Sequence, residues 1–208
     1  MNFLAHLVLA GSSPPWRVGC LLPDLVRGPL ASDLNPDVAR GVAHHRRVDR
    51  RTDAHPATCR SVARLQPRHG RFSGILVDVL YDHFLAAQWP QYCPRSLDHF
   101  TDAVYSDLRG PGVTLAPAAV EPVFEQMARQ DWLGGYATLD GIELTLWRMS
   151  QRLTRRLNRS LRLDAAVSDL VASYDALRAD FDEVWADLRS LADVDSILVL
   201  TPSHGITL

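Results

Sequence analysis

The sequence predicts an all-α protein that forms a single helical domain. Apolar residues at helical spacing dominate the chain, and alternating apolar and polar runs bounded by turn residues are missing. The length of 208 residues, with 47% hydrophobic and 22% charged, suits one domain with a sizeable core. No internal repeat or low-complexity linker divides the sequence. We expect one domain over residues 1–208, with a motif-bearing part (1–90), a helical remainder (91–195) and an irregular tail (196–208).

The first two predicted helices are short. Asn2 can cap a helix that runs through Ala10, and the segment Gly11–Pro15 then breaks it. A second helix is expected from about Trp16 to Val26. Pro23 should kink or break this helix, because proline lacks the backbone N–H donor and crowds the preceding turn.

The following helices have clearer boundaries. Asn35-Pro36 is a start signal, an N-cap followed by proline at the first helical position, for a helix that should reach about His55. Another helix spans Ala57–Leu65. The best-defined helix covers Phe72–Trp89, where apolar residues follow i, i+3, i+4 spacing. Four later helices are expected over Leu97–Leu108, Ala116–Leu133, Gly141–Leu157 and Asp164–Ala192.

Composition argues against several classes of protein. The longest apolar runs, such as Ile75–Leu80, are too short to span a bilayer, and the N-terminus has no basic region typical of a secretory signal. Three widely spaced cysteines fit neither a disulfide framework nor a zinc ribbon. The net charge of -2 and the lack of a recognition motif or aromatic platform disfavour nucleic-acid binding. We therefore expect a cytoplasmic protein without a nucleic-acid or membrane partner.

Charged residues are strongly segregated along the chain. Every basic residue is arginine. Residues 40–71 contain nine arginines and two acids, and residues 148–162 contain six arginines and no acid. Residues 164–195 contain nine acids and two arginines. These segments are either solvated helix faces that pair with one another or a basic face for an anionic partner, such as a phosphate ester or an acidic protein.

Histidines and aspartates concentrate in the first 83 residues, on segments that otherwise predict buried helix. His6 is surrounded by apolar residues, and Asp24 lies in an apolar run where an unpaired carboxylate would be costly to bury. His45, Asp49 and Asp53 are spaced four apart and therefore line one helix face. Each has an ordinary interpretation as well: a hydrogen-bonded core histidine, or aspartates paired with neighbouring arginines.

A second pair of acids lies on the Phe72–Trp89 helix. Asp78 and Asp82 are spaced four apart, His83 follows directly, and no arginine lies within a helical turn. Two acids on an apolar face need a cation, and one divalent metal ion could compensate both carboxylates. Mixed imidazole and carboxylate ligands suit manganese, iron, zinc or magnesium-like ions. Such an ion beside arginines suits hydrolysis of a phosphate ester.

Four segments occur in a distinctive order. They are NFLAHL (Asn2–Leu7), GCLLPDLVRG (Gly19–Gly28), HRRVDRRTD (His45–Asp53) and DVLYDHFL (Asp78–Leu85). Together they resemble the bacterial acyl carrier protein phosphodiesterases, also called acyl carrier protein hydrolyases. The resemblance implies hydrolysis of the phosphodiester that joins 4′-phosphopantetheine to a serine of holo-acyl carrier protein. It also implies a helical bundle of the HD-phosphohydrolase-like type and a divalent metal ion, typically Mn²⁺, with Mg²⁺, Fe²⁺ or Co²⁺ as alternatives. The order Asp82-His83 is the reverse of the usual HD pattern.

The resemblance falls on the residues that burial singles out, and it suggests three roles. The predicted metal ligands are His6, Asp24, His45 and Asp82. The predicted catalytic groups, which orient water, move protons or orient a ligand, are Asp78, His83 and Asp49. The candidates for holding the phosphate are Arg27, Arg46 and Arg47.

The implied partner is acyl carrier protein, a small acidic protein that could dock on the arginine-rich segments 40–71 and 148–162. The oligomeric state stays open. Two other functions fit the same residues. One is an HD-like phosphohydrolase that acts on a nucleotide or another small phosphodiester. The other is a non-catalytic helical module that binds acyl carrier protein.

Overall fold

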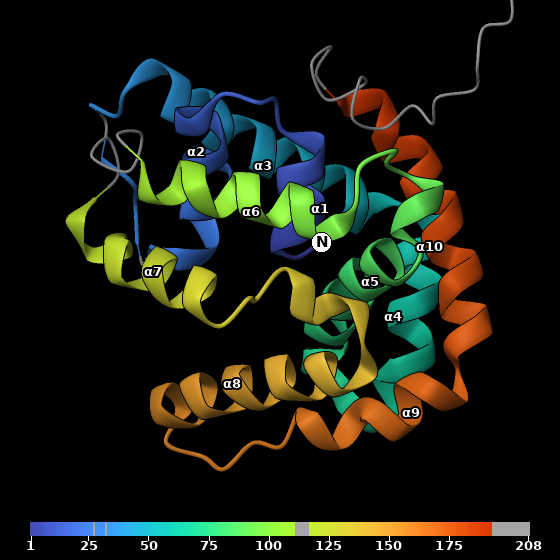
Figure 1. Ribbon diagram of the computed structural model, residues 1–208. Coiled ribbons are helices and arrows are strands. Elements are labelled where there is room, and N and C mark those ends of the chain that lie inside the picture. The colour runs from blue at the N-terminus through green and yellow to red at the C-terminus, as the bar shows by residue number, and fades with distance from the viewer. Residues whose placement is uncertain (27, 32, 111–116, 193–208) are drawn as a thin grey trace, which may run out of the picture.

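Helices make up the regular structure of this protein (Figure 1). The computed structural model describes residues 1–26, 28–31, 33–110 and 117–192, and these contain α-helices and short 3-10 turns but no β-strand. The predicted all-α class is therefore confirmed. The HD-phosphohydrolase-like type and the division into three parts stay predictions. Within the described ranges, no helix combines the length and apolar character needed to cross a membrane.

The first two helices begin and end close to the predicted positions. Helix α1 covers Phe3–Leu9, and the side chain of Asn2 accepts a backbone hydrogen bond at its start. Helix α2 covers Pro14–Leu25 and continues through Pro23. Every residue of α1 is buried, so His6 lies in the interior.

Helices α2 and α3 pack against each other through two glycines. Helix α3 covers Pro36–Ala54, with the predicted N-cap Asn35. A Cβ atom on Gly19 would lie 2.1 Å from the carbonyl oxygen of Val38, and one on Gly41 would lie 2.2 Å from a carbonyl oxygen of α2. Since any side chain at either position would clash with backbone, the glycines set the close spacing of the two helices.

Helix α5 (Ser73–Ala87) is central, in agreement with its apolar spacing. It packs against α1, α4 (Pro56–His69), α8 (Leu139–Leu157) and α10 (Tyr174–Leu188) (Figure 1). Most of its side chains are buried, so the polar residues that it carries must find partners inside the protein.

The segment that follows is less helical than predicted. Helix α6 covers Leu97–Arg109, as expected, but α7 covers only Glu121–Arg129 in place of a helix over 116–133. The chain turns at Asp131, which has a positive φ of 43°. The Asp131 carboxylate accepts a hydrogen bond of 2.8 Å from the hydroxyl of Tyr105, which holds this turn against α6.

The helix predicted over 164–192 is divided in the structure. Helix α9 covers Val167–Ala172, the chain bends at Ser173, and α10 follows. At the bend, the hydroxyl of Tyr174 lies 2.9 Å from Nε2 of His83, and its ring packs edge-on against Phe84 of α5. These tertiary contacts redirect the chain, so that α10 runs along α4 and α5 (Figure 1). The predicted irregular tail lies outside the described residues.

Candidate metal centre and adjoining pocket

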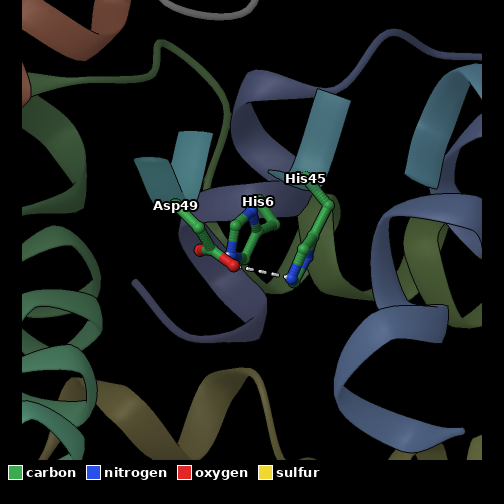
Figure 2. Close-up of side chains that lie close together, drawn as sticks. All are labelled: His6, His45 and Asp49. Atoms are coloured by element: carbon green, nitrogen blue, oxygen red, sulfur yellow. Dashed lines mark ion pairs between the residues drawn. The ribbon is translucent and has the colours of Figure 1, made fainter. Parts of the chain in front are cut away.

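Three side chains from two helices converge on one point: His6 of α1 and His45 and Asp49 of α3 (Figure 2). One ligand atom from each lies within 4.8 Å of the other two. Nε2 of His6 is 3.0 Å from Oδ1 of Asp49, and Nε2 of His45 is 2.9 Å from Oδ2 of the same carboxylate. The two imidazole rings stack with their centroids 3.9 Å apart. Both histidines therefore direct a ring nitrogen at a single carboxylate.

His45 is oriented by the neighbouring helix. Its Nδ1 lies 2.7 Å from the carbonyl oxygen of Cys20 in α2, so Nδ1 carries the hydrogen and Nε2 faces Asp49. Burial acts to lower the pKa of His45, but the hydrogen bond to Asp49 and the charge on Asp24 outweigh it and raise this pKa. A ring held by a backbone carbonyl on one nitrogen presents the other to a ligand, as metal-binding histidines commonly do.

His6 is fully buried and poorly satisfied. Neither of its ring nitrogens makes a hydrogen bond of normal geometry, although Nε2 lies close to Asp49. Burial is the main cause that lowers the pKa of His6 to about 4, so the ring is neutral at ordinary pH. A neutral buried imidazole without a normal partner is the form of histidine that binds a metal ion.

Two carboxylates complete the surroundings. Partial burial would raise the pKa of Asp49, but the close imidazole rings of His45 and His6 hold it well below its usual range. Asp24, at the end of α2, places Oδ1 3.8 Å from Nε2 of His45. Desolvation and the neighbouring carboxylates raise the pKa of Asp24 to about 6, although His45 acts in the opposite direction. Both side chains are more than one-third exposed, so solvent reaches the site.

The donor set fits a divalent cation. It offers two imidazole nitrogens and one carboxylate within bonding range of a common centre, with a second carboxylate beside them. The unsatisfied nitrogens of His6 are the clearest sign, because a buried polar atom needs a partner. His6, His45 and Asp49 therefore form an arrangement that could hold a metal ion.

Asp82, a predicted ligand, is not among the converging side chains. Its Oδ2 accepts a hydrogen bond of 2.7 Å from the backbone N–H of Leu4, and its Oδ1 lies 3.3 Å from the N–H groups of Asn2 and Ala5. Burial raises the pKa of Asp82 to about 7, against these hydrogen bonds. A carboxylate at this position compensates the unpaired N–H groups and the positive end of the α1 dipole. In this arrangement Asp82 anchors the helix that carries His6.

The predicted catalytic residues on α5 have separate surroundings. Nδ1 of His83 lies 2.8 Å from the carbonyl oxygen of Tyr136, and its Nε2 lies 2.9 Å from the hydroxyl of Tyr174. Both ring nitrogens are thus occupied by other parts of the chain. Asp78 accepts a hydrogen bond of 2.7 Å from the amino group of Met1 and faces a pocket.

The predicted phosphate-binding arginines do not gather at the site. Arg46 is exposed on α3. A guanidinium nitrogen of Arg47 lies 3.4 Å from the carbonyl oxygen of Leu191, so this side chain points toward the end of the described chain. Arg27 lies outside the described residues.

A pocket of about 720 Å³ adjoins the candidate metal centre. Asp24 and Asp78 line it together with Arg152 and Arg156 of α8. A smaller hollow of about 390 Å³ continues along α8 and shares Phe3, Met149 and Arg152 with the pocket. The only sequence signal for these two arginines was the basic segment 148–162, which did not single them out as phosphate ligands.

Comparison with known proteins matches this chain to one family. The family model described as acyl carrier protein phosphodiesterase matches residues 1–188. A protein of that name from Serratia proteamaculans (strain 568) is 34% identical over 193 residues, which cover 92% of this chain and 97% of the relative. Relatives of the same name from Pectobacterium atrosepticum and Yersinia pestis are 35% and 36% identical; the matches cover 95% and 73% of this chain and 100% and 79% of the relatives. No solved structure matches the chain. The resemblance predicted from the four sequence segments is confirmed.

Proposed function

Because the chain belongs to the acyl carrier protein phosphodiesterase family, we propose that it hydrolyses the phosphodiester between 4′-phosphopantetheine and a serine of holo-acyl carrier protein. The products are apo-acyl carrier protein and free 4′-phosphopantetheine, and the expected place of the reaction is the cytoplasm. The observation that carries the proposal is the convergence of His6, His45 and Asp49 beside a pocket lined by arginines.

His6, His45 and Asp49 are the residues that would hold a divalent ion, which we propose to be Mn²⁺. Two imidazoles and one carboxylate suit Mn²⁺, and they also suit Fe²⁺, Co²⁺ or Zn²⁺. Bound there, the ion would lower the pKa of a water molecule and offset negative charge on the phosphoryl oxygens. Asp82 contributes indirectly, because its hydrogen bonds to the start of α1 position His6.

The remaining chemistry is assigned to side chains that face the pocket. Asp24 has a pKa of about 6, so near neutral pH its carboxylate can accept a proton from water and return one to the serine oxygen. Arg152 and Arg156 carry fixed positive charges in the same pocket and are suited to bind the non-bridging phosphate oxygens. Asp78 lines the same pocket and accepts a hydrogen bond from the amino group of Met1, which also lines it.

The intact mass of holo-acyl carrier protein, incubated with this protein and Mn²⁺, tests the proposal. We expect loss of the phosphopantetheine mass with metal and no loss after chelation. His45→Ala should reduce the rate by about 10²–10⁴-fold, because the site loses one of three ligands. His99→Ala is the matched control and should keep the wild-type rate, since His99 is exposed on α6.

An unchanged mass under every metal ion would overturn the carrier-protein reaction and direct the assay to nucleotides and small phosphodiesters. Titration of Mn²⁺ into chelator-treated protein tests whether Asp82 is a metal ligand or only anchors the start of α1. Asp49→Ala should abolish binding, whereas Asp82→Asn should retain it in protein that stays folded by circular dichroism. Loss of binding in folded Asp82→Asn would restore Asp82 as a ligand.

A further inference from the structure

Helix α8 presents an exposed stripe of aromatic, apolar and cationic side chains. The members recur at helical spacing and form what we call the α8 stripe: Leu144, Trp147, Arg148, Gln151 and Arg155. Trp147 is 47% exposed and Leu144 is 45% exposed, and they lie three residues apart on one helix. Arg148 packs over the ring of Trp132, at 5.6 Å from its centroid, and is thereby held in place.

The arginines of α8 have no acidic partner within the described part of the chain. Of the six arginines in residues 148–162, only Arg162 makes an ion pair there, with Asp164. Several of the others are spaced three or four apart on the helix, such as Arg148 with Arg152 and Arg152 with Arg155. Like charges at this spacing destabilise a helix by about 0.2–0.5 kcal/mol per pair. The arrangement is therefore unfavourable in the isolated protein and becomes favourable beside an anionic partner.

The composition of the stripe is that of a protein-binding surface. Tryptophan and arginine are the residues most enriched among those that dominate binding energy at interfaces. Arginines beside an exposed tryptophan on one helix fit a partner with acidic side chains and a small apolar recess. A free small anion would not need Trp147 or Leu144.

The position of the stripe relates it to the pocket. Trp147, Arg148 and Arg155 line the smaller hollow, which shares Arg152 with the pocket that contains Asp24. A protein bound on the stripe would therefore lie beside the mouth of the pocket. A flexible prosthetic arm could then follow the hollow toward the candidate metal centre.

We propose that the α8 stripe is the docking surface for the acidic carrier protein on which this enzyme acts. The inference rests on the proposed function for the identity of the partner. It assigns recognition to residues 144–155 and removes the arginines of residues 40–71 from the interface.

Charge reversal of one arginine in each segment tests this assignment. Arg155→Glu should raise the Michaelis constant for holo-acyl carrier protein about tenfold at low salt with kcat unchanged, because it weakens encounter but touches no reacting group. Trp147→Ala should raise it similarly, but without altering its dependence on salt. Arg50→Glu, an equal charge change on the exposed surface of α3, is the matched control and should leave both constants unchanged.

Binding of apo-acyl carrier protein, followed by fluorescence anisotropy, makes the test independent of catalysis. We expect the affinity to fall in Arg155→Glu and to hold in Arg50→Glu. Equal affinity of wild type and Arg155→Glu, or no binding by wild type, would overturn the docking surface even if the enzyme is active. Binding that depends on Arg155 in a protein that never cleaves the holo form would uphold the surface and overturn the proposed reaction.

Discussion

The two arginine-rich segments of this protein look alike in sequence and differ in the folded chain. In residues 40–71, four of the nine arginines form ion pairs with acids of the C-terminal helices. The pairs are Arg51 with Asp187, Arg60 with Asp180 and Glu183, Arg64 with Asp180, and Arg68 with Asp169. In residues 148–162, within the ranges that the structure describes, only Arg162 has such a partner.

The difference arises from where the acidic segment folds. Helices α9 and α10 carry most of the acids that follow residue 163, and α10 runs along α3 and α4 (Figure 1). Carboxylates of α9 and α10 therefore pair with four of the nine arginines of the first segment and, within the described residues, with none of the second. The comparison teaches that charge segregation in a sequence has two uses, internal pairing and partner recognition, and that packing decides between them.

Removal of Asp180, the acid that pairs with two arginines of the first segment, should have the largest effect on stability. Asp180 is 5% exposed and accepts hydrogen bonds from Arg60, Arg64 and Ser61. Asp180→Ala should lower the free energy of unfolding by about 2–4 kcal/mol, because charged hydrogen bonds are lost while the two arginines can regain water. Urea unfolding measures this change.

Arg155→Ala on α8 is the control for Asp180→Ala and should leave the unfolding free energy almost unchanged, since Arg155 is exposed and has no ion pair in the described chain. Similar losses in the two variants would contradict the distinction between a structural and a free arginine segment.

Helix caps and apolar spacing are local signals, and they predicted the helices whose boundaries depend on nearby residues. The caps at Asn2 and Asn35 and the apolar spacing of α5 located these helices closely. The bend at Ser173 was missed, because it depends on contacts of Tyr174 with His83, nearly a hundred residues away. Helical spacing alone cannot report such a contact.

The sequence predicted part of the candidate site. His6, His45 and Asp49 were named because polar groups on buried helices need partners, and the structure brings these three together. That reasoning cannot tell which partner a buried carboxylate finds, and Asp82 finds the N–H groups of α1. Arg152 and Arg156 line the pocket through the packing of α8 against α5, which no sequence pattern encodes.

Lowering the pH should have a smaller effect on the stability that Asp180 contributes. Burial would raise the pKa of Asp180, but hydrogen bonds from Arg64, Ser61 and Arg60 outweigh it and lower this pKa below its usual value. A carboxylate with a depressed pKa stabilises the folded state above its unfolded pKa of about 3.9 and loses that contribution as pH falls through the folded value.

The stability difference between wild type and Asp180→Asn should therefore be constant from pH 7 to about pH 5 and shrink as the pH falls further toward pH 3. Urea unfolding at a series of pH values follows this change. A difference that grows on acidification would show that the Asp180 pairs do not stabilise the folded protein.

The smallest effect is expected at the edge of the same network, where Asp187 accepts two hydrogen bonds of 2.5 Å from Arg51. The Asp187 side chain is 27% exposed and that of Arg51 is 52% exposed. Asp187→Ala should thus cost less than about 1 kcal/mol, and 1 M salt should erase the difference from wild type, because exposed pairs are screened. Under the same salt, the loss in Asp180→Ala should largely persist, since Asp180 is buried. If salt removed both losses equally, the first arginine segment would be a surface network throughout, and its arginines would be as available to a partner as those of α8.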